Sequence, residues 1–279
     1  MVVSKESDAQ LVDYSMLFSV TDYKFYAVYI EVNVHDSVTS LDLLDWYDET
    51  YTDAADPGRY NISGVVVSPK SSSIAGKITL PRSINNKPVI GVTGFSGSNV
   101  TAIFWEGGDN PELRMVRTSA FQNTPLKFFE FTSGLRTIAQ SAFYTQRNAI
   151  ADERCIALLG EAPLLKIDAD AFNSAFGFRN IAEFKLRGTV QEIAAHAFLF
   201  GQNGNNVISV LKIGTPDEPS ELRMCGSADY AGIRPSDTSY SSFITKATIY
   251  KKSGVFNDAI VDQSAPHIYG VGSWDVQSI

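Results

Sequence analysis

A nine-residue pattern of apolar and polar positions recurs through the middle of the chain. An apolar residue is followed by a second one three positions later, and an Ala-Phe pair ends the pattern. The copies are Leu113–Phe121, Leu135–Phe143, Leu164–Phe172 and Val190–Phe198, and a degenerate copy runs from Ile90 to Phe95. The Phe residues follow one another at intervals of 26, 22, 29 and 26 residues. A recurrence at this period predicts a chain built from stacked structural repeats.

A second, alternating pattern lies between these copies and predicts β-strands. It occurs at Val100–Trp105, Leu126–Phe131, Ile181–Leu186 and Ile208–Ile213. A fifth strand is expected at Ile156 and Leu158. Alternation sends one set of side chains inward and the other outward. Because a single strand cannot bury its apolar residues alone, the copies must share one core, and we expect a mainly β solenoid.

Two further stretches resemble phrases of a known family. Gly76–Pro81 reads GKITLP, and Asn86–Gly91 reads NKPVIG. Together with the Ala-Phe copies they resemble BspA-type leucine-rich repeats, over about Gly76–Ile213. Ala247–Lys252, followed by Val255-Phe256, is similar to the closing strand and short helix of that family.

The resemblance implies a leucine-rich-repeat solenoid with β-rich N- and C-terminal caps. Family members are mostly non-enzymatic surface, adhesion and virion-associated proteins, so the resemblance carries over no catalytic residue. The chain departs from the family in one respect. Many members have a Cys shortly after Ala-Phe, whereas Gln122-Asn123, Tyr144-Thr145 and Asn173-Ser174 stand there in this chain.

We expect three parts along the chain. Residues 1–68 form an N-terminal β-rich arm and cap, residues 69–214 form the leucine-rich repeats, and residues 215–279 form a C-terminal loop and cap. The cap is expected to cover the first open edge of the repeats. Thr215–Ser242 contains several Pro and Gly residues and is expected to be an irregular loop.

The N-terminal part contains its own periodic stretches. Tyr14–Val20 and Tyr23–Val34 read as two strands joined near Thr21-Asp22, and Tyr60–Ser68 reads as a third. A short helix is expected over Leu41–Tyr47. The longest interval between the Phe residues predicts an insertion after Phe143, with a helical turn over Ala149–Cys155.

Composition narrows the functional class. The 279 residues are 44% hydrophobic and 19% charged, with a net charge of −8 and no long Lys/Arg run, which argues against nucleic-acid binding. The apolar runs are too short for membrane insertion. Cys155 and Cys225 make no disulfide framework. The first residues show no export signal, which fits a virion component assembled in a host cytoplasm.

The candidate chemical groups do not form a recognisable catalytic or metal motif. The acidic residues of the N-terminal part lack the spacing of a calcium loop and are interpreted as a solvated face, and calcium binding by them is left open. These residues are Asp42, Asp45, Asp48, Glu49, Asp53 and Asp56. The histidines, His35, His196 and His267, are far apart, and His196 takes a repeat position held by Ser or Asp in other copies. We therefore expect no metal and no cofactor.

The outward side of the alternating strands is the candidate binding face. Aligning the strands gives two outward columns, Ala102, Phe128, Cys155, Glu183, Val210 and Phe104, Glu130, Ala157, Lys185, Lys212. The stacked sheet of a solenoid offers an extended binding surface. Phe104 and Phe128 would form an exposed aromatic patch on it, with Glu130, Glu183 and Lys185 as its charged members.

The sequence therefore predicts a non-enzymatic structural or interaction protein. We expect a virion component, such as an accessory, fibre or tail-associated protein of a phage, that binds a protein of a larger assembly or a host-surface protein or glycan. Formation of a homo-oligomer stays open. One alternative is a bacterial cell-surface adhesin without its signal peptide. An alternative of another class is a carbohydrate-active hydrolase that uses Asp45 and Asp48 as acid and base.

Overall fold

Strands make up most of the ordered structure. The computed structural model describes residues 14–21, 24–31, 37–53, 61–144, 153–175, 180–200, 207–227, 230–235, 243–262 and 267–279, with the backbone alone in the first two ranges. Within these ranges the chain is mainly β, as expected, and α1 (Glu153–Glu161) is the only α-helix.

The longest sheet collects one short strand from each copy of the Ala-Phe pattern. Its order is β17-β14-β12-β11-β9-β7-β4-β3, and the short β6 (Ser83–Ile84) pairs with β7 at its side. The strands are β3 (Leu44–Tyr51), β4 (Ile62–Pro69), β7 (Lys87–Val92), β9 (Met115–Val116), β11 (Thr137–Ile138), β12 (Lys166–Ile167), β14 (Glu192–Ile193) and β17 (Met224–Cys225). All neighbours from β4 to β17 are parallel, whereas β3 is antiparallel to β4. We call this the first sheet.

The register of the first sheet follows the repeat. Val116, Ile138, Ile167 and Ile193, the aliphatic residues five positions before each Phe, lie opposite one another on successive strands and are fully buried. The degenerate copy differs from the sequence alignment, because Val92 rather than Ile90 lies opposite Val116. The stretch between this row and the Phe is thus two residues shorter in the degenerate copy.

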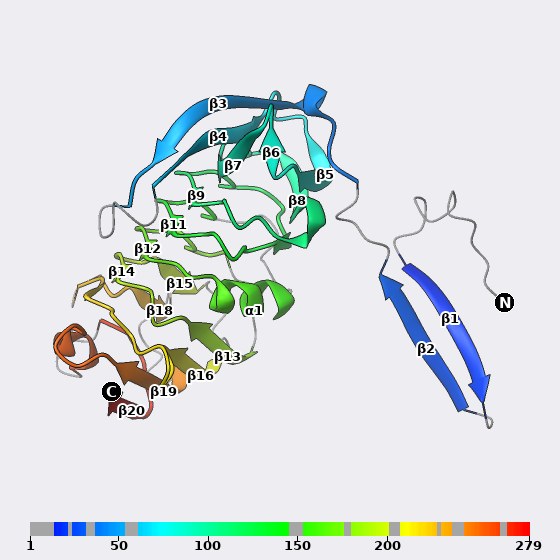
Figure 1. Ribbon diagram of the computed structural model, residues 1–279. Helices are drawn as coiled ribbons and strands as arrows, with labels where there is room; N and C mark the ends of the chain where they lie inside the picture. Colours follow the sequence, from blue (N-terminus) through cyan, green and yellow to red (C-terminus); the bar gives the residue numbers. More distant parts are fainter. Residues whose placement is uncertain are drawn as a thin grey trace.

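The alternating strands form two further parallel sheets. One has the order β10-β8-β5, with β5 (Ala75–Leu80), β8 (Asn99–Trp105) and β10 (Phe128–Phe129). The other has the order β13-β16-β19-β20, with β13 (Asn180–Leu186), β16 (Val207–Ile213), β19 (Ile244–Lys251) and β20 (Trp274–Ser278). Figure 1 shows these strands across the molecule from β9, β11, β12 and β14, with α1 between β8 and β13.

A stack of phenylalanine rings fills the core between the sheets. Phe95, Phe121, Phe143, Phe172 and Phe198 are fully buried, and the ring centroids of successive members lie 5.2, 5.5, 5.0 and 5.0 Å apart. Burying each ring contributes about 1.5–3 kcal/mol, and each aromatic pair adds about 0.5–1.5 kcal/mol. One buried Phe from each copy of the pattern therefore lies next to the Phe of the following copy.

The turn before each Ala-Phe pair has left-handed backbone. Ser119, Ser141, Asp170 and His196 have φ of 53, 57, 57 and 54°. Few residues other than glycine adopt this conformation without strain. The backbone therefore restricts this variable position to residues that tolerate a left-handed conformation, here Ser, Asp and His.

The helix α1 replaces a strand in the alternating series. Ile156 and Leu158, expected in a strand, lie in α1, so that expectation is wrong. Cys155, expected on the outward face, is buried: its thiol sulfur lies 3.3 Å from the carbonyl oxygen of Phe129 and 3.5 Å from that residue's backbone nitrogen. The helix packs against β13 at Gly160, where an added Cβ would lie 3.0 Å from the carbonyl oxygen of Lys185. The helical turn expected over Ala149–Cys155 overlaps α1 only at Glu153–Cys155, and the rest of that stretch lies outside the described residues.

The N-terminal part forms strands where most of them were expected. β1 (Tyr14–Thr21) and β2 (Lys24–Glu31) pair antiparallel, with Tyr14 opposite Glu31 and Thr21 opposite Lys24. The expected extension of the second strand to Val34 lies outside the described residues. A helix over Leu41–Tyr47 is wrong: only the 3-10 turn η2 (Leu41–Leu43) forms, and β3 follows it.

The C-terminal part continues the sheets past the boundary expected at residue 214. β17 lies within the stretch expected to be an irregular loop and extends the first sheet, pairing Cys225 with Ile193. β15 (Phe198–Phe200) pairs in parallel with β18 (Ile233–Pro235). Among the described residues, the other 3-10 turns are η3 (Glu106–Gly108) and η4 (Asp258–Val261). No helix among the described residues is long and apolar enough to cross a membrane.

Candidate binding groove

The end of β3 folds across the outer face of the first sheet. The Tyr51 hydroxyl lies 3.1 Å from the hydroxyl oxygen of Thr137 on β11. Glu49 and Arg117 form an ion pair of 2.9 Å. The Tyr51 ring packs against a small buried cluster of Val66, Ile90 and Met115, which is separate from the main core. Figure 1 shows β3 arching over the sheet, with its end pointing toward β11.

A groove lies between this overhanging strand and the sheet. Residues Glu49–Asp53 line one wall of a hollow of about 600 Å³. Its floor is a row of outward residues from successive strands, Met115, Thr137, Lys166 and Glu192, which lie opposite one another in register. Gln191 and Arg223 line the groove beyond Glu192. We call this hollow the β3 groove.

Among the lining residues of the groove that the structure describes, the formal charges balance. Its acidic lining residues are Glu49, Asp53 and Glu192, and its basic ones are Arg117, Lys166 and Arg223, three of each sign. Lys166 lies 3.2 Å from Asp168 and 3.6 Å from Glu192. The hydrogen bond to Asp168, together with both nearby carboxylates, raises the pKa of Lys166 and keeps its ammonium charged.

Tyr51 is the partly buried aromatic residue of the groove. Burial raises the pKa of its phenol, although the hydrogen bond with Thr137 acts in the opposite direction. The phenol therefore stays neutral over the physiological range and can both donate and accept a hydrogen bond.

The aromatic patch expected to be exposed on the outward face is largely covered in the structure. Phe104 and Phe128 do stack, with centroids 5.1 Å apart. However, only 8% of Phe128 is exposed, and the Arg154 guanidinium of α1 lies 5.4 Å from its ring centroid. Phe104 is half-buried and packs against the core. The expectation of an exposed Phe128 is wrong, because the insertion after Phe143 forms a helix that lies against this ring.

Glu130 is likewise buried rather than outward. One of its carboxylate oxygens accepts a 2.7 Å hydrogen bond from the Trp105 backbone N–H, and its carbonyl accepts one of 3.0 Å from the Trp105 indole. β10 ends at Phe129, so the side-chain carboxylate takes a bond that a longer strand would make with its backbone. Glu130 therefore holds the end of β8 in place.

The other two residues of the predicted face pair with their neighbours. Glu183 forms an ion pair with Lys212 on the adjacent strand β16, and Lys185 forms one of 2.7 Å with Glu161 at the end of α1. Because α1 separates β10 from β13, the structure does not bring the five predicted residues onto one continuous surface. A binding role for them stays a prediction.

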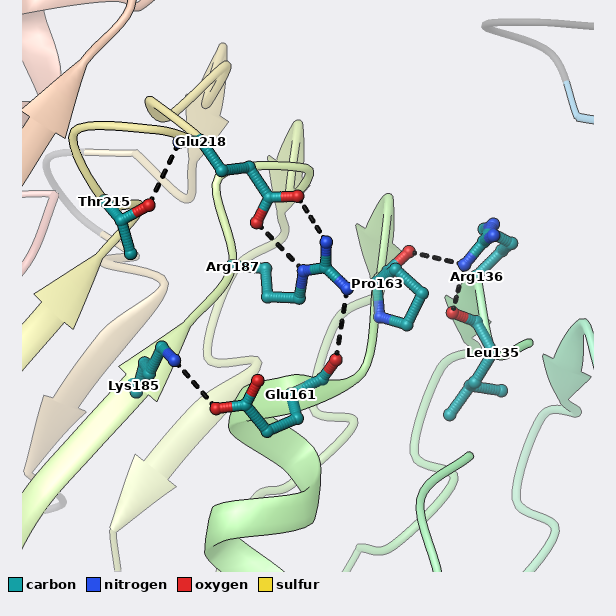
Figure 2. Close-up of polar contacts among 8 residues, drawn as sticks. All are labelled: Leu135, Arg136, Glu161, Pro163, Lys185, Arg187, Thr215 and Glu218. Atoms are coloured by element: carbon teal, nitrogen blue, oxygen red, sulfur yellow. Dashed lines mark hydrogen bonds and ion pairs between the residues drawn. The ribbon is translucent and has the colours of Figure 1, made fainter. Parts of the chain in front are cut away.

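Figure 2 shows the polar contacts at the end of α1. Arg187 binds both carboxylate oxygens of Glu218, at 2.9 and 2.5 Å, and lies 3.5 Å from the Glu161 carbonyl oxygen. The pKa of Glu218 is lowered, chiefly by this hydrogen bond to Arg187. Arg136 donates to the carbonyls of Leu135 and Pro163 at 3.3 and 3.1 Å. These arginines tie successive turns together.

The acidic stretch is spread along β3 and its flanks. Asp48 pairs with Lys87 at 2.6 Å, Glu49 pairs with Arg117, and Asp53 is buried. Asp45 and Asp48 are three positions apart on one strand and so lie on opposite faces. The structure does not bring this proposed acid and base together. Asp56 lies outside the described residues.

The remaining candidate groups are set in the core or in turns. Burial raises the pKa of the Cys225 thiol to about 12, so it stays protonated at neutral pH. The Nδ1 of His267 lies 3.2 Å from the carbonyl oxygens of Cys225 and Gly226. His35 lies outside the described residues. Among the residues that the structure describes, no three His, Cys, Asp or Glu side chains gather closely enough to hold a metal ion.

Sequence reasoning missed the β3 groove, although part of its signal was present. Thr137, Lys166 and Glu192 each stand directly before the buried aliphatic residue of a copy, and neighbours in a strand face opposite sides. The residues at that position could therefore have been predicted to form a row on the outward side of the sheet. No local pattern indicates that β3 bends over this row. No protein-family model and no curated protein sequence matches the chain.

Proposed function

We propose that the chain is a non-enzymatic recognition module of the BspA-type leucine-rich-repeat class, and that it binds a polyhydroxylated glycan in the β3 groove. The repeat assignment is supported by the row Val116, Ile138, Ile167 and Ile193 and by the phenylalanine stack. Both advance by one member with each copy of the sequence pattern.

The observation that carries the glycan proposal is the balance of carboxylates and cations among the described lining residues of the β3 groove. Carboxylates such as Glu192 accept hydrogen bonds, whereas Lys166 and Arg223 donate them, and the described lining residues together carry no net charge. An ionic ligand would gain little overall attraction there. A sugar hydroxyl both donates and accepts, so a polyhydroxylated chain can satisfy both kinds of group.

The ion pairs make these groups a preorganised set. Lys166 is held by Asp168 and Glu192, and Glu49 is held by Arg117, so their positions are largely fixed before a ligand arrives. Hydrogen bonds to charged groups are roughly twice as strong as those between neutral groups. The neutral phenol and ring of Tyr51 supply an amphipathic surface beside them.

A host surface is the setting that we propose for the glycan, with the chain acting as a virion component in attachment. The resemblance to a class that includes virion-associated and adhesion proteins supports this setting. The proposal assigns no catalytic step to the groove.

A glycan array tests this function with the full chain as probe. Glu192→Gln removes a groove carboxylate paired with Lys166, and Glu183→Gln removes a carboxylate paired with Lys212 outside the groove. We expect the unmodified chain and Glu183→Gln to bind the same glycans, and Glu192→Gln to bind them at least about tenfold more weakly, which is ~1.4 kcal/mol. Absence of binding to any glycan, or equal loss in both variants, would contradict the proposal.

A further inference from the structure

Among the described strands, none pairs with either outer edge of the hairpin of β1 and β2. Its two eight-residue strands pair with each other, and neither pairs with another strand in the part of the chain that the structure describes. A two-stranded hairpin is marginally stable by itself in water. A long edge without charges is a template for pairing with another chain.

The two strands differ in the charges that they carry. β2 has Lys24 at one end and Glu31 at the other, whereas no residue of β1 is charged. Charged residues on an edge discourage further pairing. The outer edge of β1 is therefore the edge that is open to a partner strand.

The sequence of β1 reads as a palindrome of residue classes. Tyr14–Val20 runs Tyr-Ser-Met-Leu-Phe-Ser-Val, which is symmetric about Leu17 in apolar residues and serines. A two-fold contact brings the same segment of both copies together, and antiparallel pairing reverses one relative to the other. Only a segment with such symmetry presents like classes to itself at every position.

We infer that β1 pairs antiparallel with β1 of a second copy, with Leu17 opposite Leu17. In this register Ser15 meets Ser19, Met16 meets Phe18 and Tyr14 meets Val20 of the other copy. The two hairpins then form one four-stranded sheet in the order β2-β1-β1-β2. Apolar cross-strand pairs of this kind stabilise a sheet, whereas like charges placed opposite each other destabilise it.

The dimer is proposed on grounds separate from those for the β3 groove, whose described lining residues lie between Glu49 and Arg223. It has a consequence for binding if the groove takes a repeating glycan. Two grooves on one particle convert the second binding event into an intramolecular one, which raises the overall affinity without any new contact.

Light scattering on the full chain tests the pairing and its register. The unmodified chain is expected at twice the 30.5 kDa of one copy. Leu17→Asp and Leu17→Lys each place two like charges opposite one another, so each variant alone is expected at 30.5 kDa. An equal mixture of the two places Asp opposite Lys and should restore the dimer. A monomeric unmodified chain, or a mixture that stays monomeric, would overturn the inference.

A cross-linking pair gives a second readout that does not depend on charge. Directly opposite residues in such a ladder have Cα atoms about 4.5–5.5 Å apart, within reach of a disulfide. Leu17→Cys should therefore form a covalent dimer on oxidation. Phe18→Cys should not, because the two copies of residue 18 would lie roughly 8 Å apart. Cys155 and Cys225 are buried and give no background. Equal cross-linking of both variants would exclude the register.

Discussion

The Tyr51 hydroxyl lies 3.1 Å from the Thr137 hydroxyl oxygen, although 86 positions separate the two residues in the sequence. This contact joins the end of β3 to β11, the strand whose Ile138 follows Val92 and Val116 in the buried aliphatic row. The contact therefore fixes the position of Tyr51, on the wall of the β3 groove, relative to Thr137 on its floor.

Removing the Tyr51 hydroxyl tests whether this contact stabilises the fold. Tyr51→Phe keeps the ring in its apolar cluster and deletes the bond, so we expect a loss of roughly 0.5–1.5 kcal/mol in the free energy of unfolding. Tyr47→Phe on the same strand is the control, because Tyr47 is exposed. Urea denaturation measures both. Equal stabilities of the two variants would contradict a role for the contact.

The phenylalanine stack predicts a large effect for a single truncation. Phe143 lies between Phe121 and Phe172 and is fully buried, so Phe143→Ala should cost about 3–5 kcal/mol in unfolding free energy. Phe104→Ala should cost less, because that ring is half-buried. Denaturation curves compare them. A Phe143→Ala variant as stable as Phe104→Ala would be incompatible with the stack as the centre of the core.

The left-handed turn predicts opposite effects for two replacements at one position. Ser141 has a φ of 57°, which glycine adopts without strain. We expect Ser141→Gly to stabilise the fold by about 0.5 kcal/mol and the β-branched Ser141→Val to destabilise it by about 1–3 kcal/mol. Ser141→Ala controls for loss of the hydroxyl. Thermal unfolding measures all three, and a neutral Ser141→Val would show that this turn is relaxed.

The Arg187–Glu218 pair predicts a pH-dependent contribution to stability. The folded state lowers the pKa of Glu218 below its ordinary value of 4.5, so the stabilisation is present above that value and is lost as pH falls through the folded pKa. Both side chains are about one-third exposed, so we expect Glu218→Gln to cost roughly 1 kcal/mol or less at pH 7.

Unfolding free energies of Glu218→Gln and the unmodified chain should therefore converge in acid. The double variant with Arg187→Ala should lose less unfolding free energy than the sum of the losses of the two single variants, because both single variants remove the same interaction. A difference that persists unchanged below the folded pKa of Glu218 would assign the stabilisation to another contact.

The parts of the fold that follow from local periodicity could be predicted from the sequence. The row Val116, Ile138, Ile167 and Ile193 and the Phe stack each repeat at fixed offsets, and burial of an apolar residue at every period requires stacking. The left-handed turns could not be predicted in this way, because the Ser, Asp and His residues at that position form no hydrophobic pattern. They share only a backbone conformation.

The candidate site depends on contacts between segments far apart, which no period encodes. Phe128 is covered because an insertion inside the repeat forms α1, and Glu130 turns inward because β10 ends before it. Leu41–Tyr47 has residues that tolerate a helix, and pairing with β4 makes most of it a strand instead. Such outcomes are set by tertiary packing rather than by local preference.

Amide hydrogen exchange with and without an array-selected glycan tests the central claim most directly, because exchange slows where a bound ligand closes local opening. We predict slower exchange in Glu49–Asp53 and around Thr137, Lys166 and Glu192, with no change in β8 and β10. Protection confined to Phe104, Phe128 and their strands would contradict the β3 groove as the binding site and would favour the aromatic face instead.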